Sequence, residues 1–120
     1  MNIDDYLGRP WLSPGYDCWG LVRDVYQREL NVSLPAFLCD SRNPRKVGLA
    51  LKQNSSPLNP LFKECDLKNY AIVGFSKLGR LCHVGIYYDG GYLHCDRGVG
   101  VCYESSVHPY VVSHVCELVG

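Results

Sequence analysis

The clearest helical pattern in this chain begins at Asp17-Cys18-Trp19-Gly20-Leu21-Val22-Arg23-Asp24-Val25-Tyr26. From Cys18 to Leu30, apolar side chains recur at the i, i+3, i+4, i+7 spacing that places them on one face of an α-helix. Asp17 stands at the expected N-cap, because its carboxylate can accept from the N–H groups of the first turn. Asn31 marks the expected end. The stretch therefore predicts an amphipathic helix with a cysteine in its first turn.

The C-terminal half has a different pattern, in which short runs rich in Val, Ile and Tyr are separated by turn residues. We predict strands at residues 70–75, 82–88, 91–95, 99–104 and 110–118. Asp89-Gly90 has the residue types that a two-residue hairpin turn requires. A second, shorter helix is expected from Asn43 to about Gln53, with Pro44 at its first position. Helices followed by an antiparallel sheet of about five strands indicate an α+β fold.

Composition and charge exclude several classes of protein. The chain has 120 residues, with 12 Lys and Arg against 12 Asp and Glu, so its net charge is zero. Without a basic excess it is a poor candidate for nucleic-acid binding. No apolar run approaches the roughly 20 residues that span a bilayer. The length fits one domain over residues 1–120, and the acidic start, Met1–Asp5, predicts no secretory signal peptide.

The seven cysteines contain no C-x-x-C pair, which weakens a zinc interpretation. We therefore expect no metal, and we interpret most of these thiols as small buried apolar groups in a reducing compartment. Cys18 differs because free N–H groups and the helix dipole at a helix start lower the pKa of a thiol. We expect it to react with alkylating agents faster than the other cysteines. The alternative is a structural thiol packed in the core below Trp19.

A nucleophilic cysteine needs a base, and the chain has four histidines. His83 and His94 lie in neighbouring predicted strands. If Asp89-Gly90 is a two-residue turn, His83 pairs with Asp96, and His94 becomes a diagonal neighbour of His83 on the same face. One imidazole could then accept the Cys18 proton while the other orients it. A lone histidine in a strand is more often structural, so the pair is what indicates a site.

These residues resemble the motifs of a known family. The start of the predicted helix is similar to the nucleophile motif of the NlpC family of papain-like cell-wall peptidases, and His83-Val84-Gly85-Ile86-Tyr87-Tyr88 followed by His94 resembles its second motif. Trp19 and residues 29–35 look most like the members found in tailed phages as tail-tip assembly proteins. The resemblance covers about residues 7–35 and 71–105 and implies a papain-like fold.

The resemblance also implies an activity. It implies a cysteine endopeptidase that hydrolyses an amide bond in peptidoglycan stem peptides, after γ-D-glutamate, without a cofactor. Cys18 would be the nucleophile, His83 the general base and His94 the residue that orients His83. The family has a tyrosine in the loop before the cysteine. Trp11 is the closest match, Tyr16 is a second source of the hydroxyl, and with Asp17 they are the substrate-binding candidates.

Other interpretations stay open. The chain could be a catalytically silent structural module of a phage tail tip, or a papain-like amidase or acyltransferase that uses the same three residues. Retention of Cys18, His83 and His94 together favours the enzyme. The expected partners are the stem peptide and phage tail proteins. We expect synthesis in a bacterial cytoplasm and action at the cell wall, as a component of the virion.

Overall fold

The computed structural model describes residues 1–13, 15–36, 43, 45–46, 48–50 and 62–119. Among these residues a 3-10 helix, η1 (Ile3–Asp5), precedes one long helix, α1 (Cys18–Leu30). The strands that follow are β1 (Phe62–Glu64), β2 (Ile72–Lys77), β3 (Arg80–Tyr88), β4 (Gly91–Asp96), β5 (Gly100–Glu104) and β6 (Val111–Leu118). No helix in the described ranges is both long and apolar enough to cross a membrane.

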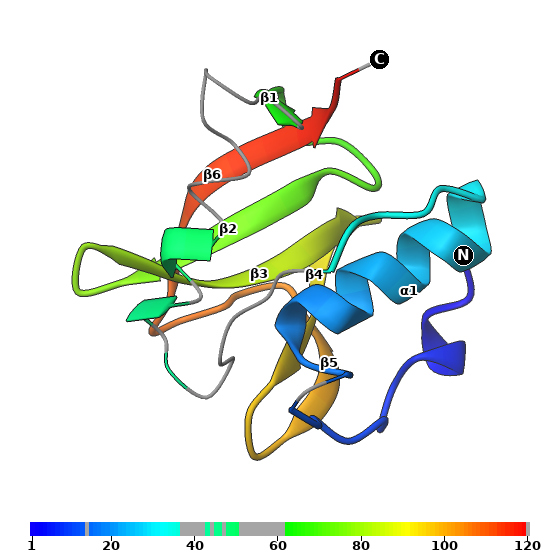
Figure 1. The fold of residues 1–120 in the computed structure, drawn as a ribbon, viewed down its shortest axis with the longest axis horizontal. Coiled ribbons are helices and arrows are strands. Elements are labelled where there is room, and N and C mark those ends of the chain that lie inside the picture. Colours follow the sequence, from blue (N-terminus) through cyan, green and yellow to red (C-terminus); the bar gives the residue numbers. More distant parts are fainter. Residues whose placement is uncertain (14, 37–42, 44, 47, 51–61, 120) are drawn as a thin grey trace.

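The strands form one antiparallel sheet in the order β1-β6-β2-β3-β4-β5 (Figure 1). Hairpins connect β2, β3, β4 and β5 in succession, and β6 pairs with the side of β2 that β3 leaves free. Helix α1 packs against β3 and β4. One helical layer on an antiparallel sheet is the predicted α+β architecture, which the structure confirms.

Both ends of α1 lie where the sequence predicts them. The Asp17 carboxylate accepts the Gly20 N–H at 2.8 Å, which satisfies one of the unpaired donors of the first turn. At the other end Asn31 adopts the left-handed conformation, with φ of 54°, and its N–H donates to the Tyr26 carbonyl. The buried face of the helix includes Leu21, Val22 and Val25, each with no exposed surface.

The strand predictions hold to within two residues at each end. Strand β1 was not predicted, because three residues are too few to show an alternating pattern. It is an edge strand whose Phe62 pairs with Leu118 of β6. In the predicted helix at 43–53, Arg45-Lys46 and residues 48–50 are helical, and the Asn43 side chain accepts the Arg45 N–H. The remaining positions of that helix lie outside the described residues.

The sheet is packed on both faces. Cys18, Val84, Ile86 and Leu93 belong to the apolar cluster beneath α1. Phe75 belongs to a smaller cluster with Val73 and Val107. Side chains alternate across a strand, so β3 presents Val84 to the first cluster, while the His83 ring stacks on Phe75 of the second. This two-sided packing is what buries polar residues within the sheet.

Candidate active site

His83 and His94 are both buried and are joined by a hydrogen bond. His83 Nε2 lies 2.9 Å from His94 Nδ1, and the rings are nearly perpendicular, at 84°. The register that makes this possible pairs Tyr88 with Gly91 and Gly85 with His94. The turn between the strands has positive φ at Asp89 (50°) and Gly90 (83°), as a two-residue turn of this type requires. The predicted loop, register and shared face are confirmed.

Glu104 extends this pair and was not predicted. One of its carboxylate oxygens lies 3.2 Å from His94 Nε2. A carboxylate can only accept, so His94 Nε2 is the donor in this contact, and in the neutral form of His94 its Nδ1 is then an acceptor. His83 Nε2 must then donate to His94 Nδ1, which leaves His83 Nδ1 with a free lone pair. Glu104 therefore holds His83 in the tautomer that a general base at Nδ1 needs.

The position of Glu104 depends on the β4–β5 hairpin. Asp96 pairs with Gly100, so residues 97–99 form the turn and Cys102 lies directly opposite His94. Glu104, two residues beyond Cys102, shares its face. The predicted strands at 91–95 and 99–104 contained His94 and Glu104. Their relative register could not be derived from the sequence, because the residues that form the turn between the two strands were not known.

The His83 ring packs against two aromatic rings, which also contact each other. The Phe75 ring lies 5.5 Å from it and the Tyr110 ring 5.1 Å, both stacked. Gly85 leaves room for this packing, because a Cβ there would lie 2.9 Å from His94 Cβ and 3.0 Å from the Phe75 ring. Burial, with a smaller effect of His94, lowers the pKa of His83 to about 3. The imidazole is therefore neutral, and able to accept a proton, at neutral pH.

Cys18 is buried, with 5% of its surface exposed. Burial, and after it the Asp17 carboxylate, raises the pKa of the thiol to about 12. Hydrogen bonds from the backbone N–H groups of Val84 and Trp19 act in the opposite direction but are weaker. The prediction of an easily ionised thiol is therefore wrong for this structure, because removal from water outweighs the helix start.

Cys18 contacts β3 at its backbone, next to His83. Its sulfur lies against the N–H of Val84, the residue next to His83. Within the described part of the chain, no hydrogen bond links the thiol to either imidazole. Catalytic hydrogen bonds in structures without substrate are often long and close only when substrate binds. The structure thus brings the two histidines together on one face of the sheet, while Cys18 belongs to the cluster beneath α1 and meets β3 at Val84, the residue next to His83.

The three substrate-binding candidates have structural partners. Asp17 caps α1. The Tyr16 hydroxyl donates to Asp24 at 2.7 Å. The Arg97 guanidinium lies over the Trp11 ring, 5.5 Å from its centre. Gly20 faces the preceding loop, since a Cβ would lie 2.5 Å from the Gly15 carbonyl oxygen.

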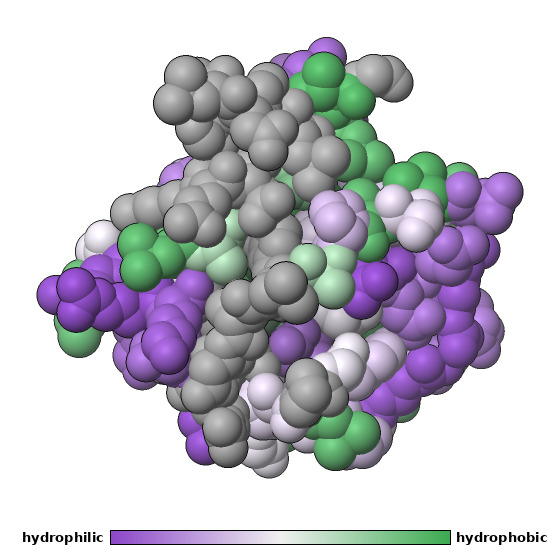
Figure 2. Space-filling model, viewed as in Figure 1, coloured by the Kyte–Doolittle hydropathy of each residue, from purple (hydrophilic) through white to green (hydrophobic). Residues whose placement is uncertain are grey.

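A basic groove of about 610 Å³ lies next to Tyr110. Tyr110, which stacks on His83, forms part of its wall. Its cationic residues are Arg45, Lys77 and Arg80, all exposed. Figure 2 shows the hydrophilic surface at the outer end of the β2–β3 hairpin, which carries two of them. The groove therefore fits a ligand with negative charge.

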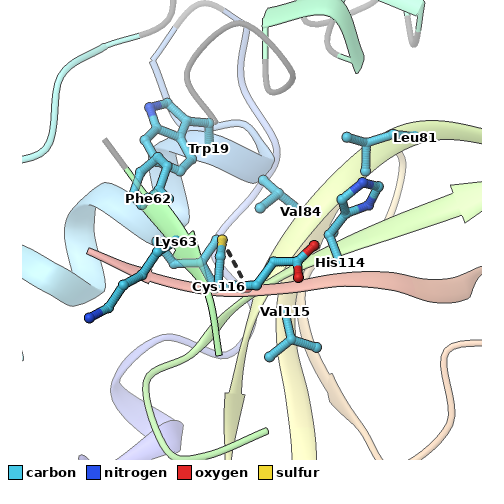
Figure 3. A pocket seen from close by; sticks show the side chains of 11 residues that line it. Trp19, Phe62, Lys63, Leu81, Val84, His114, Val115 and Cys116 are labelled. Carbon is cyan, nitrogen blue, oxygen red and sulfur yellow. Dashed lines mark hydrogen bonds between the residues drawn. The ribbon is translucent and has the colours of Figure 1, made fainter. Parts of the chain in front are cut away.

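A second cavity, of about 280 Å³, lies on the α1 side of the sheet (Figure 3). Trp19 and Phe62 stand at one end, packed edge to face, and Leu81 and His114 at the other. Val84 also lines it.

Comparison with known proteins agrees with the α+β fold. The model of the NlpC/P60 family matches residues 7–119, which is nearly the whole chain. A search of curated proteins gave no match.

The buried neutral state of His83 predicts a pH-dependent stability. Its folded pKa, about 3, lies below the ordinary value near 6.5, so between these values the unfolded chain binds the additional proton. Stability should be fully present above pH 6.5 and fall toward pH 3, by up to about 1.4 kcal/mol per pH unit. In urea unfolding followed by tryptophan fluorescence, His83→Gln should reduce this slope and the exposed control His108→Gln should not. Equal slopes for all three proteins would contradict a buried neutral imidazole.

The charge of Asp17 predicts a second result. Asp17→Asn keeps a good N-cap but removes the negative charge beside Cys18. The pKa of Cys18 should fall, and each half unit raises the thiolate fraction about threefold. Alkylation by iodoacetamide, followed by mass spectrometry of Cys18 peptides, should therefore be faster than in wild type. Asp5→Asn, in η1, is the matched control. A rate unaffected by Asp17→Asn would show that this charge does not reach the thiol.

Proposed function

Since the chain belongs to the NlpC/P60 family, we propose that it is a cysteine endopeptidase that hydrolyses an amide bond of peptidoglycan stem peptides. Membership in this family implies cell-wall peptidase activity, and its members are typically cysteine peptidoglycan hydrolases with a papain-like fold. The observation that carries the proposal for this chain is the hydrogen-bonded row His83–His94–Glu104 beside a cysteine at a helix start. In this proposal Cys18 is the nucleophile, His83 the base and His94 the residue that orients it.

The reaction begins from uncharged groups. At neutral pH the Cys18 thiol is protonated and His83 is neutral. As the sulfur attacks the carbonyl carbon of the substrate, its proton moves to His83 Nδ1 and a C–S bond forms. In the first turn, Gly20 and Leu21 donate to Asp17. The N–H group of Cys18 at the helix start is the proposed donor to the oxyanion.

His83 then returns the proton. Its Nδ1–H protonates the leaving amine nitrogen, the C–N bond breaks, and a thioester remains on Cys18. Water attacks the thioester while His83 Nδ1 accepts a proton, and the products are a carboxylate and the regenerated thiol. Throughout, His83 Nε2–H donates to His94 Nδ1, and His94 Nε2–H donates to Glu104. This row stabilises the imidazolium that the low pKa of His83 otherwise disfavours.

The basic groove supports an anionic substrate. Stem peptides carry carboxylates, and Arg45, Lys77 and Arg80 line the hollow that begins at Tyr110. We propose that this groove holds the carboxylate next to the scissile bond, which places cleavage after γ-D-glutamate. Trp11, Tyr16 and Asp17 are proposed to form the opposite wall, on the loop before α1.

A link to phage tails is part of the proposal. Trp19 and residues 29–35, which resemble the tail-tip members, contact each other, since Trp19 Nε1 donates to the Pro35 carbonyl at 2.8 Å. The Arg23 guanidinium donates to the neighbouring Leu34 carbonyl at 3.0 Å. This packing supports treating them as one structural feature. We propose that the protein is made in a bacterial cytoplasm and acts at the cell wall with phage tail proteins.

Purified peptidoglycan tests the activity directly. Wild-type protein should release fragments whose masses correspond to cleavage after γ-D-glutamate, in the presence of a chelator, and Cys18→Ala should release none. Cys65→Ala is the matched control for loss of a thiol. Equal release by wild type and Cys18→Ala would refute a thiol mechanism. Absence of release by wild type would favour a silent tail module, and products carrying an added amine would indicate acyl transfer.

The histidine row predicts graded losses. His94→Ala should lower kcat by about 10²-fold or more, the usual contribution of a positioned proton-transfer group. Glu104→Gln should lower kcat less, with KM unchanged, because an amide can donate to or accept from His94 and no longer selects one tautomer. The pH dependence of kcat should change in the same variants. Unchanged pH profiles in both would remove His94 and Glu104 from the mechanism.

The basic groove predicts an effect on substrate binding. Arg80→Ala should raise KM about two- to fivefold, the range expected for one exposed ion pair, and leave kcat unchanged. The effect should vanish with a stem peptide whose free carboxylates are amidated. Arg28→Ala, in α1 and paired with Asp24, controls for loss of a surface cation. The same KM change with the amidated peptide would place the carboxylate elsewhere.

A further inference from the structure

Cys102 stands beside the histidine row and has no part in the proposed reaction. Its sulfur lies 3.4 Å from His94 Nε2, the same nitrogen that contacts Glu104 at 3.2 Å. The three ligand atoms, one each from His94, Cys102 and Glu104, all lie within 4.8 Å of one another. An imidazole nitrogen, a thiol and a carboxylate oxygen are the ligands that zinc takes in proteins.

The spacing of these atoms suits a tetrahedral ion. Zinc bonds of about 2.0–2.3 Å place neighbouring ligand atoms about 3.3–3.8 Å apart. The two distances at His94 Nε2, 3.4 and 3.2 Å, are close to that range. The backbone fixes the arrangement, because Cys102 pairs directly with His94 and Glu104 follows on the same face of β5. Glu104 is exposed, so an ion can enter from solvent and keep water as a fourth ligand.

We propose that His94, Cys102 and Glu104 bind a zinc-like divalent cation, and that this ion reversibly switches off the active site. The binding half of the proposal stands on the geometry of the three side chains alone. The inhibitory half rests on the proposed function. The sequence pointed to no metal because these ligands come from two strands and form no C-x-x-C pattern.

The switch acts through the position of a proton. A metal on His94 Nε2 uses that lone pair, so a neutral imidazole must carry its proton on Nδ1. His94 Nδ1–H then donates to His83 Nε2, which becomes an acceptor. The proton of His83 moves to Nδ1, the atom that must accept the proton of Cys18. Binding also releases the Cys102 proton to solvent, and removal of the ion reverses each step.

Metal binding tests the site without any activity measurement. Metal-free full-length protein is titrated with Co²⁺, whose bond to a thiolate gives a charge-transfer absorption band, and with Zn²⁺ in a calorimeter. Wild type, Cys18→Ala and the control Cys82→Ala should bind alike. Cys102→Ala should lose the band and bind at least about tenfold more weakly. Glu104→Gln, at an exposed position, should also weaken binding. Loss of binding in Cys18→Ala with retention in Cys102→Ala would place the metal on the nucleophile and overturn the site.

The proton shift is measured separately. In Cys18→Ala labelled with ¹⁵N-histidine, NMR should show His83 protonated at Nε2 without zinc and at Nδ1 with zinc. An unchanged tautomer would overturn the switch even if the metal binds. In hydrolysis, zinc should inhibit wild type and a chelator should restore it. Cys102→Ala should keep metal-free turnover within about twofold, as expected for a change outside the reacting groups, and resist zinc. If wild type hydrolyses nothing, the proposed function fails, while the binding and NMR results still decide the site and the proton shift.

Discussion

The hydrogen bond between His83 and His94 depends on the register of one hairpin, and the site is built around it. A slip of one residue between β3 and β4 would turn one ring to the other face of the sheet. The aromatic stacking on His83 and the contact from Glu104 to His94 would be lost with it. Gly85 belongs to the same constraint, because any larger residue would collide with His94 and Phe75. The short turn at Asp89-Gly90 thus fixes the hydrogen bond between His83 and His94, and with it the contact from His94 to Glu104 on strand β5.

Burial gives this site its electrostatic character. The Cys18 thiol and the His83 imidazole are both shielded from water, and in each case burial favours the uncharged form. A pre-formed thiolate–imidazolium pair is therefore disfavoured at rest. In the proposed reaction, charge develops during the attack on the substrate, next to the helix start and the row that ends at Glu104. Glu104 connects this buried row to the surface, since it is the exposed member.

His94 is the residue on which catalysis and the proposed metal site converge. Its two nitrogens face different partners, with His83 at Nδ1 and Glu104 and Cys102 at Nε2. A change at one nitrogen therefore dictates the protonation of the other. Through this coupling the proposed ion, bound near the surface, would alter the protonation of His83, which is buried against Phe75 and Tyr110. By the same coupling, a group that binds beside Cys102 would change which nitrogen of His94 carries the proton.

The sequence by itself determined the features that depend on neighbours along the chain. The ends of α1 followed from Asp17 and Asn31, and the register of the His83–His94 hairpin followed from its turn residues, because helix capping and two-residue turns are local interactions. The tertiary structure decided the rest. The burial that raises the pKa of Cys18 and the pairing of the short strand β1 depend on segments distant in sequence. Glu104 and Cys102 reach His94 only through the closure of a second hairpin. Local sequence patterns do not show which side chains are buried or which distant strands pair. Burial and strand pairing together set the chemistry of the site.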